Sequence, residues 1–78
     1  MMEILINEHE WRNSKAKRLT EIVDTLKHSG WEKFGNNGTI VFFKDTTKER
    51  AQKELNQLGI NEVGAEEWEE DLYSNNIF

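Results

Sequence analysis

Few residues in this chain could carry out chemistry. His9-Glu10 begins like the H-E-x-x-H motif of zinc metalloproteases, but Asn13 stands where the second histidine would be. His28 adjoins Ser29, yet a nucleophile needs a base that is held against it by a third group. The densest carboxylate cluster, at 66–71, lacks the alternating acids and the turn glycine of a calcium loop. We therefore expect no catalytic residue, no metal site and no cofactor.

Charge is divided unevenly along the chain. Residues 1–60 hold all ten Lys and Arg against nine Asp and Glu, a net +1, whereas residues 61–78 hold six acids and no base, a net −6. Acids that alternate with large apolar groups can occupy a basic groove and imitate nucleic acid, with the aromatic residues as energetic anchors. This pattern predicts a partner-binding segment made of Glu66, Glu67, Trp68, Glu69, Glu70, Asp71 and Tyr73. An alternative remains open, in which Trp68 and Leu72 pack on the protein's own body.

A basic cluster lies near the start of the first expected helix. It consists of Arg12, Lys15, Lys17 and Arg18. Helix amino termini attract anions, and cations there strengthen the attraction, so the cluster is a candidate anion site. Two other interpretations stay open: an ordinary solvated face, and a docking site for the acids of the C-terminal segment.

The length of 78 residues corresponds to one domain, which we expect at 1–64 with an acidic aromatic segment at 65–78. The first residues lack the basic and apolar regions of a signal peptide, and no apolar run is long enough to span a membrane. The sequence therefore predicts a cytoplasmic protein without a membrane segment.

Apolar spacing predicts the elements that would position these residues. Alternation favours a strand at 3–7, and residues 8–12 form a polar stretch. An apolar stripe predicts a helix that Asn13 or Ser14 caps and Gly30 ends, with Trp31 packed on Leu26. Residues 31–36 and 39–44 flank Asn37-Gly38, a strong hairpin signal that would pair Phe34 with Val41 and Glu32 with Phe43.

The second half of the chain follows the same logic. Thr46 and Glu49 form a capping box that starts a second helix, and Gly59 ends it with Ile60 placed to touch Leu55. A short last strand is expected at 60–63, and a short helix over 65–72. The order β-α-β-β-α-β predicts an α+β, ferredoxin-like fold with both helices on one face of an antiparallel sheet.

The two faces of that sheet are expected to differ in burial. We expect the helices to cover one set of side chains: Ile4, Ile6, Phe34, Val41 and Phe43. A second set is expected on the uncovered face: Leu5, Trp31, Ile40 and Phe42. Trp31 and Phe42 therefore join the predicted partner-binding residues, because exposed aromatic groups need cover or a partner.

Residues 38–45, followed by a helix that ends near Leu58-Gly59, resemble strand three and helix two of RNA-recognition-motif domains, and residues 4–7 resemble their first strand. The resemblance covers about half the chain and implies a sheet that stacks bases on aromatic side chains of its central strands. The matching positions here hold Leu5, Gly38 and Ile40, and the basic flank of the motif is absent. The negative net charge also repels phosphate, so nucleic acid is not the expected partner.

These observations predict a small intracellular, non-enzymatic protein-binding module. It would inhibit a basic partner protein through an acidic surface that imitates nucleic acid, as small phage or mobile-element inhibitors do. The assignment to phage or mobile-element inhibitors is based only on the size of the chain and on its high content of Asn, Lys and Glu. One alternative is a degenerate RNA or single-strand binder that uses Trp31, Lys33 and Phe42 with the basic cluster. Another is a homodimeric structural subunit whose sheet faces pair.

Overall fold

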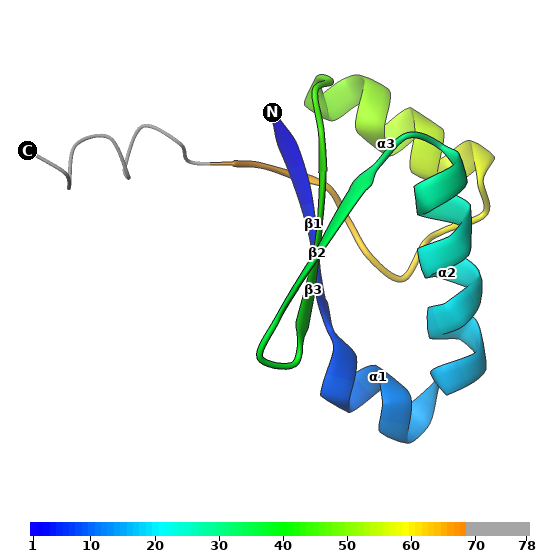
Figure 1. Ribbon diagram of the computed structural model, residues 1–78. Helices are drawn as coiled ribbons and strands as arrows, with labels where there is room; N and C mark the ends of the chain where they lie inside the picture. Colours follow the sequence, from blue (N-terminus) through cyan, green and yellow to red (C-terminus); the bar gives the residue numbers. More distant parts are fainter. Residues whose placement is uncertain (69–78) are drawn as a thin grey trace, which may run out of the picture.

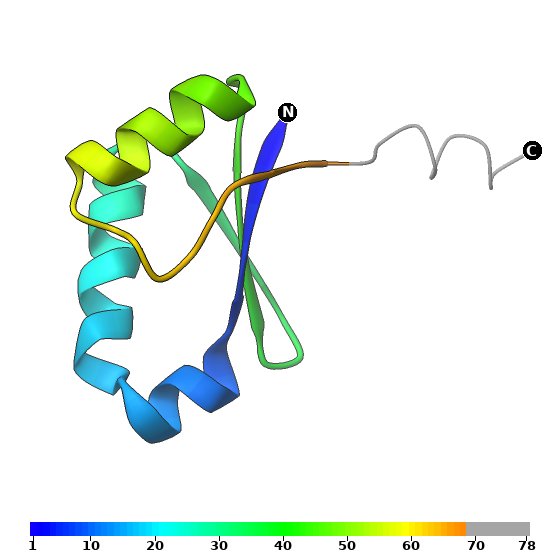
Figure 2. The same cartoon turned by 180° about the vertical axis from the view of Figure 1, so that it is seen from behind.

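The computed structural model describes residues 1–68 and contains seven elements in an α+β arrangement. Their order is β1 (Met2–Asn7), α1 (Glu8–Ser14), α2 (Ala16–His28), β2 (Glu32–Asn36), β3 (Thr39–Lys44), α3 (Lys48–Gln57) and β4 (Glu66–Glu67). The strands form one open antiparallel sheet in the order β2-β3-β1-β4. Figures 1 and 2 show α2 and α3 together on one side of this sheet, and no helix of residues 1–68 covers its other side.

The β2–β3 hairpin forms as the sequence predicts. Asn37 and Gly38 make the turn with φ angles of 46° and 87°, a conformation that these two residue types tolerate best. Phe34 pairs with Val41 and Glu32 pairs with Phe43. The register between the two strands is therefore confirmed.

The predicted burial of the sheet is confirmed for β1, where Ile4 and Ile6 are buried and Leu5 is exposed, and is wrong for Trp31 and the β2–β3 hairpin. β1 pairs with β3 so that Ile4 lies opposite Phe42 and Ile6 lies opposite Ile40, and all four side chains face the helices. Trp31 joins this core, which leaves Phe34, Val41 and Phe43 on the uncovered face with Leu5. The hairpin fixes which β2 and β3 residues are opposite each other. It does not fix how β1 aligns with β3, and β3 is apolar on both sides, so alternation alone could not choose the buried face.

The polar stretch after β1 forms a helix, α1, which the sequence did not predict. The side chain of Asn7 accepts a hydrogen bond from the Glu10 amide at 3.1 Å, which caps the first turn. The Glu8 amide donates to the Gly38 carbonyl at 2.8 Å and joins α1 to the hairpin turn. The break before α2 falls at Lys15, whose side chain makes no capping hydrogen bond, so the predicted caps at Asn13 or Ser14 were wrong.

Both longer helices end at the glycines that the sequence indicates. Gly30 and Gly59 have φ angles of 90° and 74°, which an L side chain would resist. The residue after each glycine makes a backbone hydrogen bond to the last turn of the helix before it. The Trp31 amide donates to the Leu26 carbonyl, and the Ile60 amide donates to the Leu55 carbonyl. The start of α3 differs by one residue: the cap is Thr47, which accepts from the Arg50 amide, and not Thr46.

The last strand lies later in the chain than predicted. Residues 60–63 form no strand, and β4 is the pair Glu66 and Glu67, which align with Glu3 and Met2 at the edge of β1. The expected helix over 65–72 is wrong for its described part, because Ala65 to Trp68 is not helical. The rest of that span lies outside the described residues. Glu66 and Glu67 are therefore part of the sheet.

A polar cluster ties α3 to the sheet. Glu54 accepts from the Trp31 indole Nε1 at 2.6 Å and from Lys44 Nζ at 2.8 Å, and Lys44 also donates to the Ser29 carbonyl at 2.8 Å. Partial burial acts to raise the pKa of Glu54, but the hydrogen bonds from Lys44 and Trp31 together lower the pKa below its ordinary value. The polar edge of the buried indole ring is thereby satisfied.

Candidate protein-binding face

The side of the sheet without helices, called here the outer sheet face, exposes an apolar patch. The patch consists of Met1, Leu5, Phe34, Val41, Phe43 and Trp68. Leu5 is 54% exposed, Phe34 53% and Met1 48%, which are the largest exposures among the big apolar side chains of the described chain. Contiguous apolar surface of this kind marks interaction sites in proteins that otherwise keep such residues covered.

The local sequence explains why both sheet faces are apolar. β3 reads Thr-Ile-Val-Phe-Phe-Lys, so Ile40 and Phe42 enter the core while Val41 and Phe43 point outward. Strands with apolar residues on both sides are typical of sheets that have both faces covered by other elements. Here the described chain supplies only one helical layer, so the second cover is missing over the centre of the sheet.

Three aromatic rings line one end of the outer sheet face. The ring centroids of Phe34 and Phe43 are 5.4 Å apart at an interplanar angle of 65°, and those of Phe43 and Trp68 are 4.8 Å apart at 49°. The Trp68 amide donates to the Met1 carbonyl at 2.9 Å, which holds Trp68 beside the start of β1. Chain segments far apart in sequence thus meet in one aromatic row.

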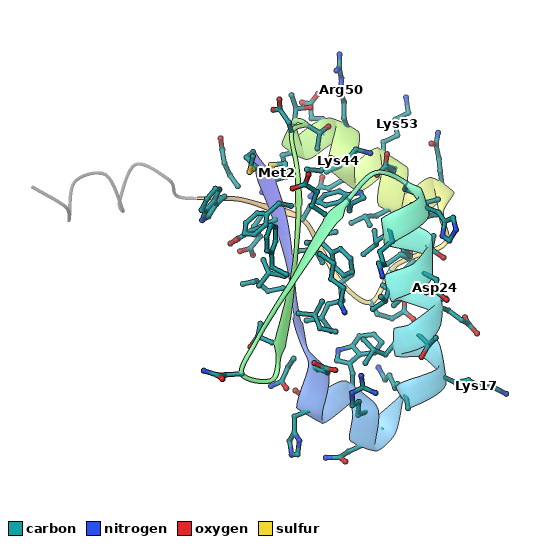
Figure 3. All side chains as sticks on the ribbon, viewed as in Figure 1. Met2, Lys17, Asp24, Lys44, Arg50 and Lys53 are labelled. Atoms are coloured by element: carbon teal, nitrogen blue, oxygen red, sulfur yellow. The ribbon has the colours of Figure 1, made fainter. Side chains whose placement is uncertain are left out.

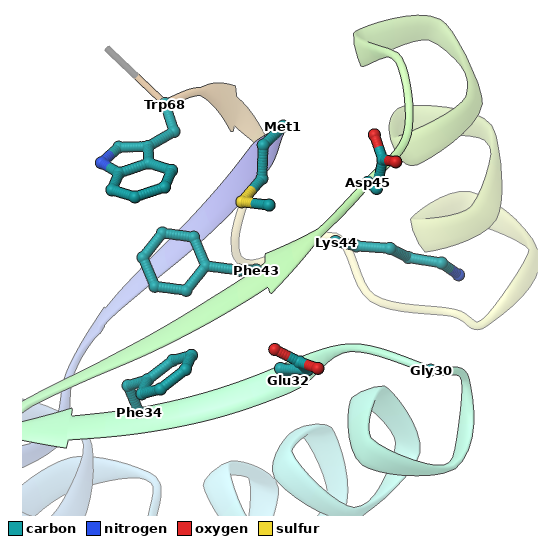
Figure 4. A pocket seen from close by; sticks show the side chains of 8 residues that line it. All are labelled: Met1, Gly30, Glu32, Phe34, Phe43, Lys44, Asp45 and Trp68. Carbon is teal, nitrogen blue, oxygen red and sulfur yellow. The ribbon is translucent and has the colours of Figure 1, made fainter. Parts of the chain in front are cut away.

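Beside this row lies a hollow of about 360 Å³, called here the aromatic hollow and shown in Figure 4. Its lining comprises Met1, Gly30, Glu32, Phe34, Phe43, Lys44, Asp45 and Trp68. Lys44 contributes only its aliphatic stem, because its ammonium group points away from the rings toward α3.

The outer sheet face carries carboxylates around its apolar patch. These acids form what is called here the acidic rim: Glu3, Glu32, Asp45 and Glu66. Both lysines of the strands lie on the other side of the sheet, since Lys33 pairs with buried Phe42 and Lys44 pairs with buried Met2. No Lys or Arg of the four described strands faces outward, so this face has a negative potential that favours a cationic partner.

The structure separates the residues predicted for partner binding. Trp31 is 3% exposed and Phe42 is fully buried, so their predicted place on a binding surface was wrong. Trp68 is half-buried against Phe43, so it packs on the protein's own body, as the alternative interpretation proposed. Glu66 and Glu67 are exposed in β4. The remaining residues of the prediction, Glu69, Glu70, Asp71 and Tyr73, lie outside the described residues.

Sequence reasoning missed Phe34 and Phe43 because it assigned them to the core. The signal that could have identified them is the pairing of two apolar runs, at 4–6 and 40–43, since an antiparallel pair of such runs leaves apolar side chains on both faces. What the pattern could not supply was the register of β1 against β3.

The basic cluster at 12–18 is largely occupied by partners from the same chain. Arg12 pairs with Glu8 at 2.6 Å, and Lys15 lies 5.0 Å from the centre of the Trp11 ring. Arg18 donates to both oxygens of Glu62, at 2.5 and 3.0 Å.

Arg18 also donates to the Gly59 carbonyl at 2.7 Å and to Glu21 at 3.2 Å. The hydrogen bonds from Arg18 lower the pKa of Glu62 to about 2, and those to Glu62 and Glu21 raise the pKa of Arg18. One acid of the 61–78 segment, Glu62, therefore docks on this cluster, as one of the alternative interpretations suggested. Lys17 points away from the body of the protein (Figure 3).

Residues 1–68 bring together no group of three or more His, Cys, Asp or Glu side chains placed to hold a metal ion. None of their helices combines the length and the apolar character needed to cross a bilayer. Comparison of the chain with protein-family models, with curated proteins and with solved structures finds no match.

Proposed function

We propose that the protein is a small, cytoplasmic, non-enzymatic protein-binding module whose outer sheet face contacts a basic partner protein. The single observation that carries this proposal is the composition of that face: an exposed apolar centre, an acidic rim, and no outward Lys or Arg on the described strands. Interfaces of this kind gain affinity from a few buried aromatic anchors and gain association rate from complementary charge at the rim.

The sequence continues after β4 with three more acids, Glu69, Glu70 and Asp71, which add to the negative charge of the chain. A face that joins carboxylates to aromatic groups imitates the charge and the flat apolar surfaces of nucleic acid. An inhibitor of a nucleic-acid-binding protein, of the kind that phages and mobile elements encode, is therefore the form of the proposal that we favour. The ferredoxin-like assignment of the fold is supported by the strand order and by one helix-containing connection after β1 and another after β3.

Two other occupants of the face are less favourable on electrostatic grounds. Phe34 and Phe43 could stack nucleotide bases, but the phosphates would then lie close to the acidic rim, and the cations proposed for them point elsewhere. A second copy of the chain would bring one acidic rim against another. Both remain as outcomes of the experiment below.

The test uses the full chain as bait in a lysate of its native host. Phe34→Ser removes an exposed anchor and Glu32→Gln removes a rim charge. Asp24→Asn makes the same charge change on the solvent side of α2 and serves as the matched control (Figure 3). We expect wild type and Asp24→Asn to capture the same protein, and Phe34→Ser to lose it.

The captured protein is then purified and its binding measured directly. Phe34→Ser should weaken affinity about 10-fold or more, as truncation of an aromatic anchor does. Glu32→Gln should mainly slow association, and this difference should shrink as salt is added. Capture that is unchanged by Phe34→Ser would overturn the proposal. So would binding of mixed-sequence RNA or DNA at that face, or dimerisation that Phe34→Ser abolishes.

A further inference from the structure

We infer that the aromatic hollow is a binding site for a guanidinium group, the side chain of an arginine that the partner protein presents. This inference rests on the proposed function, because it names the group by which a basic partner would be anchored. The hollow opens on the outer sheet face, and three aromatic residues, two carboxylates and a methionine line it: Phe34, Phe43, Trp68, Glu32, Asp45 and Met1.

The rings supply the first part of the recognition. An aromatic face carries negative electrostatic potential, and a cation within about 6 Å of a ring centre is attracted to it. Because Phe34, Phe43 and Trp68 are inclined to one another by 65° and 49°, they present ring faces and edges in more than one direction around the hollow. A flat cation can therefore contact more than one of them.

The carboxylates supply the second part. Glu32 and Asp45 border the hollow from β2 and from the end of β3, on the side opposite Trp68 (Figure 4). Within residues 1–68 neither side chain has a hydrogen-bond or ion-pair partner, so both are available to a ligand. A guanidinium that lies against the rings can donate to a carboxylate with its free N–H groups.

The lysine that lines the hollow does not fill it. Lys44 lines the wall, but its Nζ donates to the Ser29 carbonyl and to Glu54, both at 2.8 Å, on the helix side of the sheet. Release of Lys44 would leave the Glu54 carboxylate without that donor, which disfavours a swing into the hollow. The site is thus aromatic and bordered by carboxylates, and no Lys or Arg side chain of residues 1–68 places its charged group in it.

Arginine fits this site better than lysine for two reasons. The guanidinium is planar and weakly hydrated, so it stacks on ring faces in an open site where a strongly hydrated ammonium group keeps its water. A volume of about 360 Å³ is near the lower end of the range for small-molecule sites, which suits one long side chain.

The test is an NMR titration of the full chain with capped amino acids, which requires no knowledge of the partner. N-acetyl-arginine-amide is compared with its citrulline, lysine and trimethyl-lysine counterparts; citrulline has almost the shape of arginine and no charge. We expect arginine alone to give a saturable shift of the Trp68 indole N–H signal, with a dissociation constant on the order of millimolar for one exposed cation–aromatic site. The indole signals of Trp11 and Trp31 serve as internal controls, because these rings lie away from the hollow.

Variants locate the binding. The pair Glu32→Gln with Asp45→Asn, followed by the Trp68 indole signal, should weaken arginine binding about three-fold or more, as loss of one such contact predicts. Trp68→Ala should do the same, and because it lacks that indole it is followed by the backbone amide signals of the residues that line the hollow. Asp24→Asn should leave it unchanged. The inference is overturned if no compound saturates, if citrulline binds as well as arginine, or if lysine or trimethyl-lysine binds equally or better. These results are independent of lysate capture: a partner that Phe34→Ser releases, combined with no arginine binding, would reject the hollow and retain the proposed function.

Discussion

Replacement of Phe42 by alanine tests which face of the sheet is the core. Phe42 is fully buried at the centre of β3, opposite Ile4, and it lies beneath the helices. A buried phenylalanine removes roughly 150–250 Å² from water, worth about 4–6 kcal/mol at 25 cal/mol per Å². Measured Phe→Ala substitutions in cores cost about 3–5 kcal/mol, and we expect a value in that range here.

The exposed neighbour provides the comparison. Phe34 is 53% exposed on the outer sheet face, and its removal opens no cavity, so Phe34→Ala should cost only about 1 kcal/mol, the size of a surface strand effect. A domain of 78 residues has a total stability of about 4–12 kcal/mol at typical values per residue. Phe42→Ala therefore removes a large part of the stability, and Phe34→Ala does not.

Urea unfolding measures both effects, with the fluorescence of buried Trp31 as one reporter and circular dichroism as the second. At an m-value of about 1 kcal/mol per M, Phe42→Ala should lower the midpoint by about 3 M or leave the chain unfolded. If Phe42→Ala is unfolded, Phe42→Leu and Phe34→Leu make the same comparison. Phe42→Leu should lower the free energy of unfolding by about 1 kcal/mol, and Phe34→Leu should hardly change it. Equal or greater destabilisation by the Phe34 variants would refute the assignment of the core.

Two further perturbations test the contacts between elements. Glu62→Gln should cost about 1 kcal/mol at pH 7, near the upper end for surface ion pairs, because Arg18 grips both carboxylate oxygens. The folded-state pKa of Glu62 is lowered to about 2 from 4.5. The difference in unfolding free energy between wild type and Glu62→Gln should therefore persist above pH 4.5 and disappear as pH falls toward 2. A difference that does not change with pH would contradict this. Glu54→Ala removes the acceptor of the Trp31 indole and should cost about 1–3 kcal/mol in urea unfolding with a shift in Trp31 emission, and an unchanged midpoint would argue against the cluster.

Several features followed from local sequence alone. Asn37-Gly38 determined the hairpin and its register because a two-residue turn with positive φ leaves little choice. Gly30 and Gly59 determined the helix ends for the same kind of reason. The α+β class and the antiparallel sheet also followed from the order of periodic segments.

The errors arose where local patterns were compatible with two structures. Residues 8–12 lack an apolar stripe, and α1 forms from a cap at Asn7 and a contact with the hairpin turn at Gly38. The last strand depends on pairing with the edge of β1, and residues 60–63 show a strand-like pattern without meeting that edge. A short segment thus takes its structure from its neighbours.

The sequence by itself determined that this chain has more large apolar side chains in its strands than one helical layer can cover, and that acids without bases follow them. Only the tertiary structure decided which side chains are left outside. The alignment of β1 against β3 is a long-range choice between two faces that are both apolar, and the packing of Trp31, Ile40 and Phe42 beneath the helices determines it. That same choice places Phe34, Phe43 and Trp68 together beside two carboxylates, which no spacing along the chain indicates.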